Sequence, residues 1–298
     1  MGRASRSKQA PARQQKIAAQ RAAERRRQVR NRVLTAAGSV VVVIAIVVGL
    51  VVAYTGRNSA TAKGASNGPT GVTLSKVVSD VTNVPASTLN KVGIGSVTSK
   101  PTSVTGPALT SGGKPEMLYI GAEYCPYCAA ERWAMIVALS RFGTFSGLHT
   151  VHSASNDPAA PNTPTFTFYG SHYTSKYLTF TPVEETTNIP QGNSYTPLQQ
   201  PTSQQQALMN KYDSGGSIPF IDIGNTYVQI GDPQGLDPRT LDGKSWTQIS
   251  QALHDPSSPI AKEIDGAANQ LTAAIAKVTG HQPAGMSPQT LKSLEAGL

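Results

Sequence analysis

The residues best suited to chemistry are Cys125 and Cys128, the only two cysteines in the chain, with Pro126 and Tyr127 between them. With Cys125 as the N-cap of a helix, Pro126 takes the first helical position, where its missing N–H costs no hydrogen bond. The free N–H groups of the first turn and the positive end of the helix dipole then stabilise a Cys125 thiolate. We therefore expect Cys125 to be an acidified thiol.

A thiolate in this position attacks disulfides. Cys128 follows one turn later on the same side of the helix, so we expect it to be the shielded residue that resolves a mixed disulfide. Tyr127 is expected to be exposed between the two and to contact substrate. The motif predicts dithiol–disulfide exchange without a cofactor, because the dithiol itself carries both electrons.

Other uses of two such cysteines are a structural disulfide, a metal site or a non-catalytic binding and assembly protein. A disulfide here closes a very short loop, which contributes little stability in the chain-entropy account. Structural zinc needs four ligands, and His149 and His152 face opposite sides of the strand predicted for them. A copper chaperone using both thiols and one histidine is the main metal alternative, and we expect no metal site.

The positive charge of the chain is concentrated at its start. The net charge is +9, but residues 1–32 hold eleven of the 26 basic residues and one acid, while the other 266 residues carry −1. The remainder of the chain is therefore no basic domain, and we expect no nucleic-acid partner.

The segment 33–54 predicts a membrane anchor. It contains 22 residues without a charge, and a helix of that length spans about 33 Å, enough to cross a bilayer's hydrocarbon core. The positive-inside rule places residues 1–32 in the cytoplasm and the rest outside. A non-cleaved signal anchor in the cell membrane is favoured. A signal peptide cleaved near residues 59–62 and a twin-arginine signal are the alternatives, and both also place the main domain outside the cytoplasm.

The sequence beyond the anchor predicts an α/β domain. We expect strands at 116–121, 148–154, 165–169 and 176–183, helices at 126–142, 203–212, 245–254 and 259–279, and a loop at 184–200. A helix cap is expected at Gly143. Two apolar runs around Gly224 and Asn225 predict a β-hairpin. The expected organisation is a flexible linker with short helices at 55–115, the domain at 116–280 and a peripheral tail at 281–298.

This arrangement resembles the thioredoxin superfamily, through the strand 116–121, the CPYC motif at a helix start and the hairpin that opens at Ile218 and Pro219. The resemblance implies a thioredoxin-like fold, with a central mixed sheet flanked by helices and an insertion between the CPYC helix and the hairpin. It also implies a cis Ile218–Pro219 bond facing the cysteines. Pro126, Tyr127, Ile218 and Pro219 are accordingly expected to contact substrate.

Two closer resemblances refine this expectation. The Pro-Tyr dipeptide is similar to that of glutaredoxins, and the anchor and insertion look like the disulfide-forming DsbA type. Residues 116–280 resemble an anchored group filed as domain of unknown function 929, through the phrases GAEYCPYCAAERWAM and SIPFIDIGN. This last resemblance implies a fold and a location but no substrate. The CPYC motif and the thioredoxin resemblance predict an extracytoplasmic thiol–disulfide oxidoreductase that acts on protein thiols and disulfides with a membrane or secreted redox partner.

The sequence departs from the superfamily beside the motif. Tyr119 stands where many thioredoxins carry a buried acid, and Tyr124 replaces the usual tryptophan before the first cysteine. Glu123 and Glu131 are nearby acids. We expect Glu123 and Tyr124 to tune the site, with solvated surface positions as the alternative for both glutamates.

Overall fold

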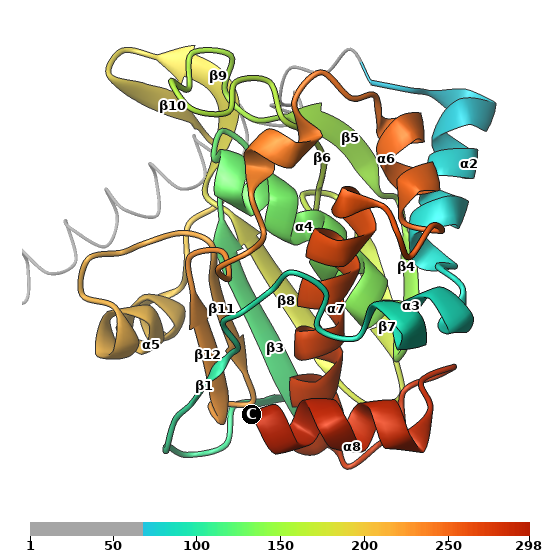
Figure 1. The fold of residues 1–298 in the computed structure, drawn as a ribbon. Coiled ribbons are helices and arrows are strands. Elements are labelled where there is room, and N and C mark those ends of the chain that lie inside the picture. Colours follow the sequence, from blue (N-terminus) through green and yellow to red (C-terminus); the bar gives the residue numbers. More distant parts are fainter. Residues whose placement is uncertain (1–67) are drawn as a thin grey trace, which may run out of the picture. The chain divides into compact units, whose positions relative to one another are not determined.

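The computed structural model describes residues 68–298 (Figure 1). The segments 1–32 and 33–54, for which a cytoplasmic tail and a membrane anchor are predicted, lie outside the described residues. Within residues 68–298, none of the helices combines the length and apolar character that a membrane crossing requires. The described residues belong to one compact unit.

A mixed β-sheet runs through the centre of this unit. The central strand β3 (Lys114–Gly121) pairs in parallel with β8 (Thr179–Glu184) and antiparallel with β11 (Phe220–Ile223). Strand β11 pairs with β12 (Tyr227–Ile230), which in turn pairs with β1 (Thr102–Ser103). The short strand β2 (Thr110–Ser111) pairs with the first residues of β3.

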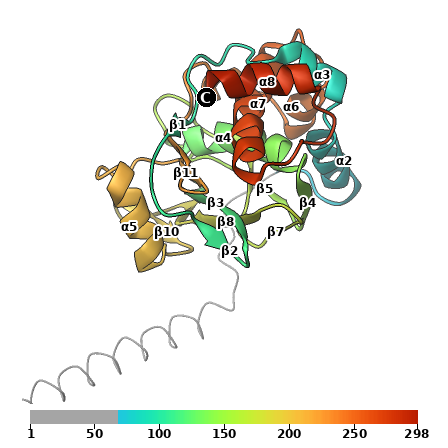
Figure 2. The same cartoon turned by 90° about the horizontal axis from the view of Figure 1, so that it is seen from below.

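The alternation of side chains along β3 assigns the two faces of the sheet. Met117 and Tyr119 belong to the larger core cluster with α4 (Pro126–Leu139) and α7 (Pro259–Thr279). Leu118 and Ile120 face the other way and pack in a second cluster with Met209 of α5 (Ser203–Tyr212). Figure 2 shows α5 on the opposite side of these strands from α4 and α7. The expected α/β architecture with helices on both faces of a mixed sheet is therefore confirmed.

Helix α4, which carries the cysteines, is buried almost all round. Of its side chains only Tyr127 is exposed. The expected helix to residue 142 with a Gly143 cap is wrong, because α4 ends at Leu139 and Ser140 is its C-cap. Gly143 instead opens β4 (Gly143–Ser146), where a Cβ would lie 2.4 Å from the Thr174 carbonyl oxygen of the paired strand β7 (His172–Ser175).

The predicted turn between β11 and β12 has the expected geometry. Gly224 and Asn225, between β11 and β12, both have positive φ, 66° and 53°, which is the requirement of a tight two-residue hairpin turn. Gly280 ends α7 in the left-handed conformation. The hairpin and the two helices α5 and α7 are therefore confirmed, and both helices have the predicted bounds.

The described residues on both sides of the predicted domain 116–280 pack against its core. Helices α2 (Gly71–Thr82) and α3 (Ala86–Val92) lie within the predicted linker, but Val77 and Leu89 are buried in the main core. The predicted tail contains α8 (Pro288–Gly297), whose Leu294 is buried in the same core. Both ends belong to the domain because their apolar side chains complete its core.

The insertion between α4 and β11 contains more strands than predicted. The expected loop 184–200 holds a separate hairpin of β9 (Thr186–Gln191) and β10 (Ser194–Pro197). Strand β5 (His149–His152) pairs with β6 (Pro164–Thr167). After β12 the chain forms a 3-10 turn, η1 (Pro238–Leu241), and helix α6 (Trp246–Ala252).

Candidate functional site

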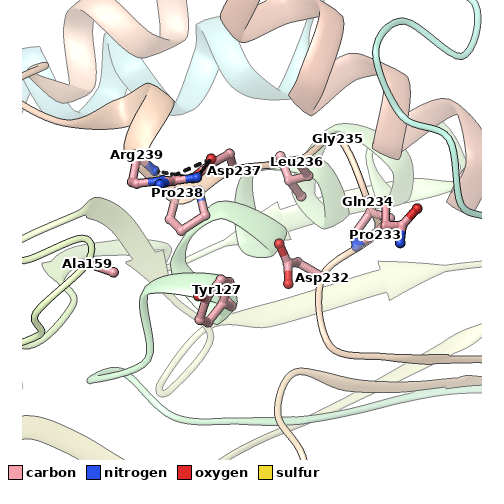
Figure 3. A pocket seen from close by; sticks show the side chains of 10 residues that line it. All are labelled: Tyr127, Ala159, Asp232, Pro233, Gln234, Gly235, Leu236, Asp237, Pro238 and Arg239. Carbon is pink, nitrogen blue, oxygen red and sulfur yellow. Dashed lines mark hydrogen bonds and ion pairs between the residues drawn. The ribbon is translucent and has the colours of Figure 1, made fainter.

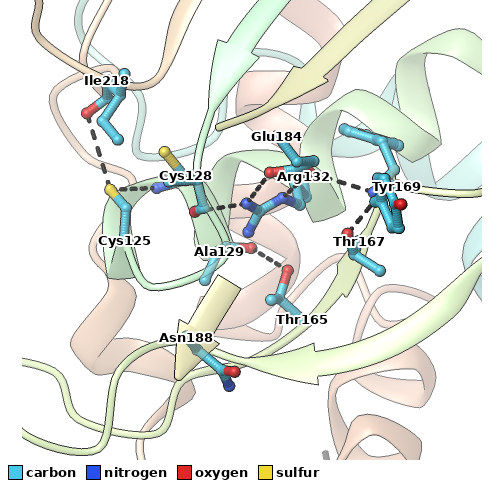
Figure 4. Close-up of polar contacts among 12 residues, drawn as sticks. Cys125, Cys128, Ala129, Arg132, Thr165, Thr167, Tyr169, Glu184, Asn188 and Ile218 are labelled. Carbon is cyan, nitrogen blue, oxygen red and sulfur yellow. Dashed lines mark hydrogen bonds and ion pairs between the residues drawn. The ribbon is translucent and has the colours of Figure 1, made fainter. Parts of the chain in front are cut away.

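Cys125 is the N-cap of α4, as the sequence predicts. Its backbone is extended, with φ −76° and ψ 120°, and Pro126 takes the first helical position. The Cys128 backbone N–H donates a hydrogen bond to the Cys125 sulfur, with 3.3 Å between nitrogen and sulfur (Figure 4). The sulfur therefore lies at the positive end of the helix, where a thiolate is stabilised.

The two cysteines have opposite electrostatic environments. The hydrogen bond from the Cys128 side chain is the largest cause that lowers the pKa of the Cys125 thiol, and backbone N–H groups of the first turn lower it further. Burial raises the pKa of Cys128 well above its ordinary value, and the neighbouring Cys125 raises it again. Both thiols are free. Cys125 is therefore the residue of the pair that ionises first.

Cys125 is more enclosed than expected. Its exposed fraction is 5%, and that of Cys128 is 0%. The Cys125 sulfur lies 3.8 Å from the Ile218 carbonyl oxygen, which it faces across the site. The Ile218–Pro219 bond is cis, and Pro219 is buried. The structure therefore brings together Cys125, Pro126, Cys128 and the Ile218–Pro219 segment.

Tyr127 is exposed, as predicted, and forms one wall of a pocket beside the motif. The pocket has a volume of about 360 Å³, and the segment 232–239 forms most of its lining, together with Ala159 (Figure 3). Asp237 accepts hydrogen bonds from the Arg239 guanidinium on its rim. Sequence reasoning missed this pocket, because no local pattern indicates that segment 232–239 folds back to Tyr127.

Glu123 and Glu131 are both buried, so the alternative that placed them on a solvated surface is wrong. Glu123 has an exposed fraction of 1%, and burial raises the pKa of its carboxyl to about 7. Glu131 is fully buried, and burial raises the pKa of its carboxyl to about 8, opposed in part by the side chain of Gln229. Burial therefore favours the neutral form of each carboxyl.

Tyr124 connects the motif to the β9–β10 hairpin. Its ring stacks on that of Tyr195, with 4.3 Å between ring centroids and 7° between ring planes. Burial raises the pKa of Tyr124 to about 12, so its hydroxyl stays protonated. The Tyr195 hydroxyl donates to the side-chain oxygen of Asn156. The expected loop 184–200 therefore delivers an aromatic side chain to the site that the sequence did not indicate.

A buried ion pair beneath the motif is the second feature that sequence reasoning missed. The Arg132 Nε and Nη2 atoms donate to the two carboxylate oxygens of Glu184 at 2.8 and 2.6 Å, and both side chains have exposed fractions of 0%. The Arg132 guanidinium carbon lies 5.9 Å from the ring centroid of Tyr119. The one available signal was that Arg132 follows Cys128 by four residues on a helix, which places both on one face.

The histidines do not join the cysteines in a metal centre. His149 is exposed, and the ring of His152 lies 4.7 Å from that of Trp246. Among residues 68–298 there is no group of three or more histidine, cysteine, aspartate or glutamate side chains able to hold a metal ion. The structure therefore gives no support to a copper site built from both thiols and one of these histidines.

Comparisons with known proteins address the family of the chain. A search of the curated proteins and a search of the solved structures both find no match. The model of one family, described as a domain of unknown function, DUF929, matches residues 100–277. That range begins before β1 and ends near the end of α7, so it includes the whole central sheet and the CPYC helix. The chain belongs to the DUF929 family.

Proposed function

We propose that the protein is a thiol–disulfide oxidoreductase with a thioredoxin-like fold. The observation that carries the proposal is the pairing of a helix-capping Cys125 with a lowered thiol pKa and a fully buried Cys128 with a raised one. A dithiol exchange cycle needs this asymmetry, because one sulfur must attack first while the other is held back.

The reaction follows from the two sulfurs. The Cys125 thiolate attacks a substrate disulfide, forms a mixed disulfide and releases one substrate sulfur as a thiolate. Cys128 then loses its proton and attacks the Cys125 sulfur. The Cys125–Cys128 bond forms, the second substrate thiolate leaves, and two electrons have passed to the substrate. The reverse sequence oxidises a substrate dithiol, and neither direction needs a cofactor.

The arrangement of strands supports the thioredoxin-like part of the proposal. Strand β3 leads directly to the motif at the start of α4. Phe220 is the register partner of Ile120, so the start of β11 lies beside the end of β3 at the cysteines. The Ile218 carbonyl faces the Cys125 sulfur and the Tyr127 ring is exposed, which supports a role for both in substrate contact. Pro126, Tyr127, Ile218 and Pro219 are accordingly the proposed substrate contacts.

The sequence supports a location outside the cytoplasm. Residues 1–32 carry a net charge of +10, and residues 33–54 are apolar, which is the pattern of a single-pass anchor with a cytoplasmic N-terminus. We propose that segment 33–54 lies in membrane lipid and that the domain faces an oxidising compartment, where protein disulfides form and persist. Its substrates are then thiols and disulfides of extracytoplasmic proteins.

The proposal is tested by equilibrating the full chain, in detergent, with defined ratios of reduced and oxidised glutathione. The fraction of protein with a Cys125–Cys128 disulfide is measured by acid quench and mass spectrometry. We expect one reversible two-electron transition, whose midpoint reports whether the site favours oxidising or reducing its substrates. A chain whose cysteines never form a reversible intramolecular disulfide would overturn the proposal. Cys125→Ser is the control that removes the transition.

A further inference from the structure

The second half of the proposed cycle has an electrostatic difficulty at Cys128. The side chain is fully buried, and a buried thiol ionises reluctantly because its thiolate loses the solvation of water. Yet Cys128 must become a thiolate to attack the mixed disulfide. The surroundings of Cys128 therefore decide how fast the cycle closes. The inference below rests on the proposed function.

Arg132 is the basic residue of α4, the helix that carries Cys128. It follows Cys128 by four residues, so that both side chains lie on one face of α4. It is fully buried, and its place is fixed from two sides. Glu184 binds Nε and Nη2 in a two-pronged contact (Figure 4). Nη2 also donates to the Ala122 carbonyl oxygen at 2.7 Å.

Ala122 joins the ion pair to the cysteines. Its carbonyl oxygen also accepts a hydrogen bond from the Cys125 N–H at 3.3 Å. A backbone hydrogen bond from Ala122 lowers the pKa of Cys128, and the positive charge of Arg132 lowers it too. Glu184 is held on the far side, where one of its oxygens accepts a hydrogen bond from the Phe168 N–H. The pair is therefore ordered with its cation towards the cysteines.

One nitrogen of the guanidinium, Nη1, is buried without a hydrogen-bond partner. Buried donors are normally satisfied, because an unmade hydrogen bond costs the full desolvation of the group. Nη1 is therefore not committed to Glu184 or to a backbone carbonyl, unlike Nε and Nη2.

We propose that Arg132 is a positioning residue of the resolving step: its buried guanidinium, held by Glu184 and the Ala122 carbonyl, stabilises the negative charge on the Cys128 sulfur. In that step the Cys128 S–H gives its proton to water, the Cys128–Cys125 bond forms and the bond from Cys125 to the substrate sulfur breaks. The departing substrate thiolate takes up a proton from water, so charge and protons balance.

Other ionisable groups act on the same charge. Cys125 and the phenol groups of Tyr119 and Tyr124 are electrostatically coupled to Cys128. Glu123 is coupled to both members of the ion pair. All four lack a positive charge, so Arg132 is the one cation among these described groups. Removing the charge of Arg132 should therefore raise the pKa of Cys128, and removing the charge of Glu184 should lower it.

The first test measures Cys128 without requiring any exchange activity. In the Cys125→Ser chain labelled with [3-¹³C]cysteine, Cys128 gives a single cysteine resonance, because the chain has two cysteines. Its chemical shift is followed against pH in three further variants. Arg132→Met/Glu184→Met removes the whole pair by apolar side chains, a change that buried ion pairs tolerate. Glu184→Gln keeps Arg132, and Arg132→Lys keeps the charge.

We expect the double variant to raise the pKa of Cys128 by about one unit, Glu184→Gln to lower it and Arg132→Lys to leave it within about half a unit. If the pair were purely structural, the pKa of Cys128 would shift in the same direction in the double variant and in Glu184→Gln, or would shift in neither. Either result would overturn the proposal. Glu184→Gln carries the test on its own, since it retains the guanidinium and a side-chain oxygen that accepts its N–H groups.

The second test measures the resolving step with both cysteines present. The chain is loaded with glutathione on Cys125 at low pH and jumped to pH 7, and release of glutathione is timed. One unit of pKa removes about nine-tenths of the thiolate but makes the remaining thiolate more nucleophilic, so the double variant should be about threefold slower. Unchanged release with a shifted pKa would contradict the role of Arg132 in this step. Absence of any glutathione release would instead count against the proposed function.

Discussion

The Cys128 backbone N–H donates to the Cys125 sulfur at 3.3 Å, so the second cysteine stabilises the first through its own main chain. The Cys128 side chain adds the hydrogen bond that lowers the pKa of Cys125 most. Cys125 is thus an acidified thiol, and Cys128, in the same helical turn, is its hydrogen-bond donor.

This relationship predicts how Cys125 reactivity changes with pH. The pKa of Cys125, from the pH dependence of its iodoacetamide reaction, should lie below that of an ordinary cysteine. Cys128→Ala should raise it, because the side-chain donor is lost. Cys128→Ser should raise it less, because the hydroxyl still donates. The reaction site is identified by peptide mass spectrometry, and equal values in both variants would contradict the role of the side-chain hydrogen bond.

A second prediction concerns stability and the buried carboxyl of Glu131. Burial raises its pKa from 4.5 to about 8, so the folded chain binds a proton more tightly than the unfolded chain. The stability that this carboxyl contributes should therefore be fully present below about pH 4.5 and be lost as the pH rises towards 8. Glu131→Gln should remove this loss, on the order of a few kcal/mol at pH 8.5, and have little effect at pH 4.5.

Urea unfolding at the two pH values measures this difference. Glu295→Gln, a change at a half-exposed position on α8, is the control and should alter stability equally at both. If Glu131→Gln and Glu295→Gln show the same pH dependence, burial of a neutral Glu131 carboxyl is contradicted.

A third prediction tests whether the helices before the sheet belong to the domain. Leu89 of α3 is 1% exposed and Val72 of α2 is 88% exposed. Leu89→Ala should cost about 2–5 kcal/mol of unfolding free energy through the cavity it leaves, while Val72→Ala should change it by less than about 0.5 kcal/mol. Equal, small effects in urea unfolding would restore the flexible linker that the sequence predicted.

The elements around the site also show what sequence patterns could and could not predict. The CPYC helix start, helix α5 and the β11–β12 turn were predictable because each depends on a local signal: a cap, a periodic run or a Gly-Asn turn. The β9–β10 hairpin was not predictable from its composition. Its strands contain Pro190 and Pro197, which disfavour central strands, and it forms a separate two-stranded sheet where proline is tolerated.

Long-range features of the site were hidden for a different reason. Arg132 and Glu184 are 52 residues apart, and their pairing depends on the parallel register of β3 and β8. A charged residue in a sequence is normally expected at the surface, so the burial of Glu123 and Glu131 carried no local signal either. The sequence predicted the helix cap at Cys125 with Cys128 one turn later, and the fold supplied the charges around them.

A fourth prediction concerns the contact between the hairpin and the motif. The stacked rings of Tyr124 and Tyr195 should be energetically coupled by about 0.5–1.5 kcal/mol. A double-mutant cycle with Tyr124→Ala and Tyr195→Ala, followed by urea unfolding, measures this coupling. Tyr195→Phe keeps the ring but loses the bond to Asn156, so it should retain the coupling. A coupling near zero would show that the hairpin packs independently of the motif.

The central claim is that Cys125 attacks and Cys128 resolves. Its most direct test is to expose Cys128→Ala to glutathione disulfide and determine covalent adducts by mass spectrometry. The account predicts that Cys128→Ala accumulates one glutathione on Cys125, removed by dithiothreitol, while the unaltered chain passes to an internal disulfide. Cys125→Ser should accumulate far less adduct, because Cys128 is fully buried. If the two single variants behave alike, or if neither forms an adduct, the proposed division of roles between Cys125 and Cys128 is contradicted.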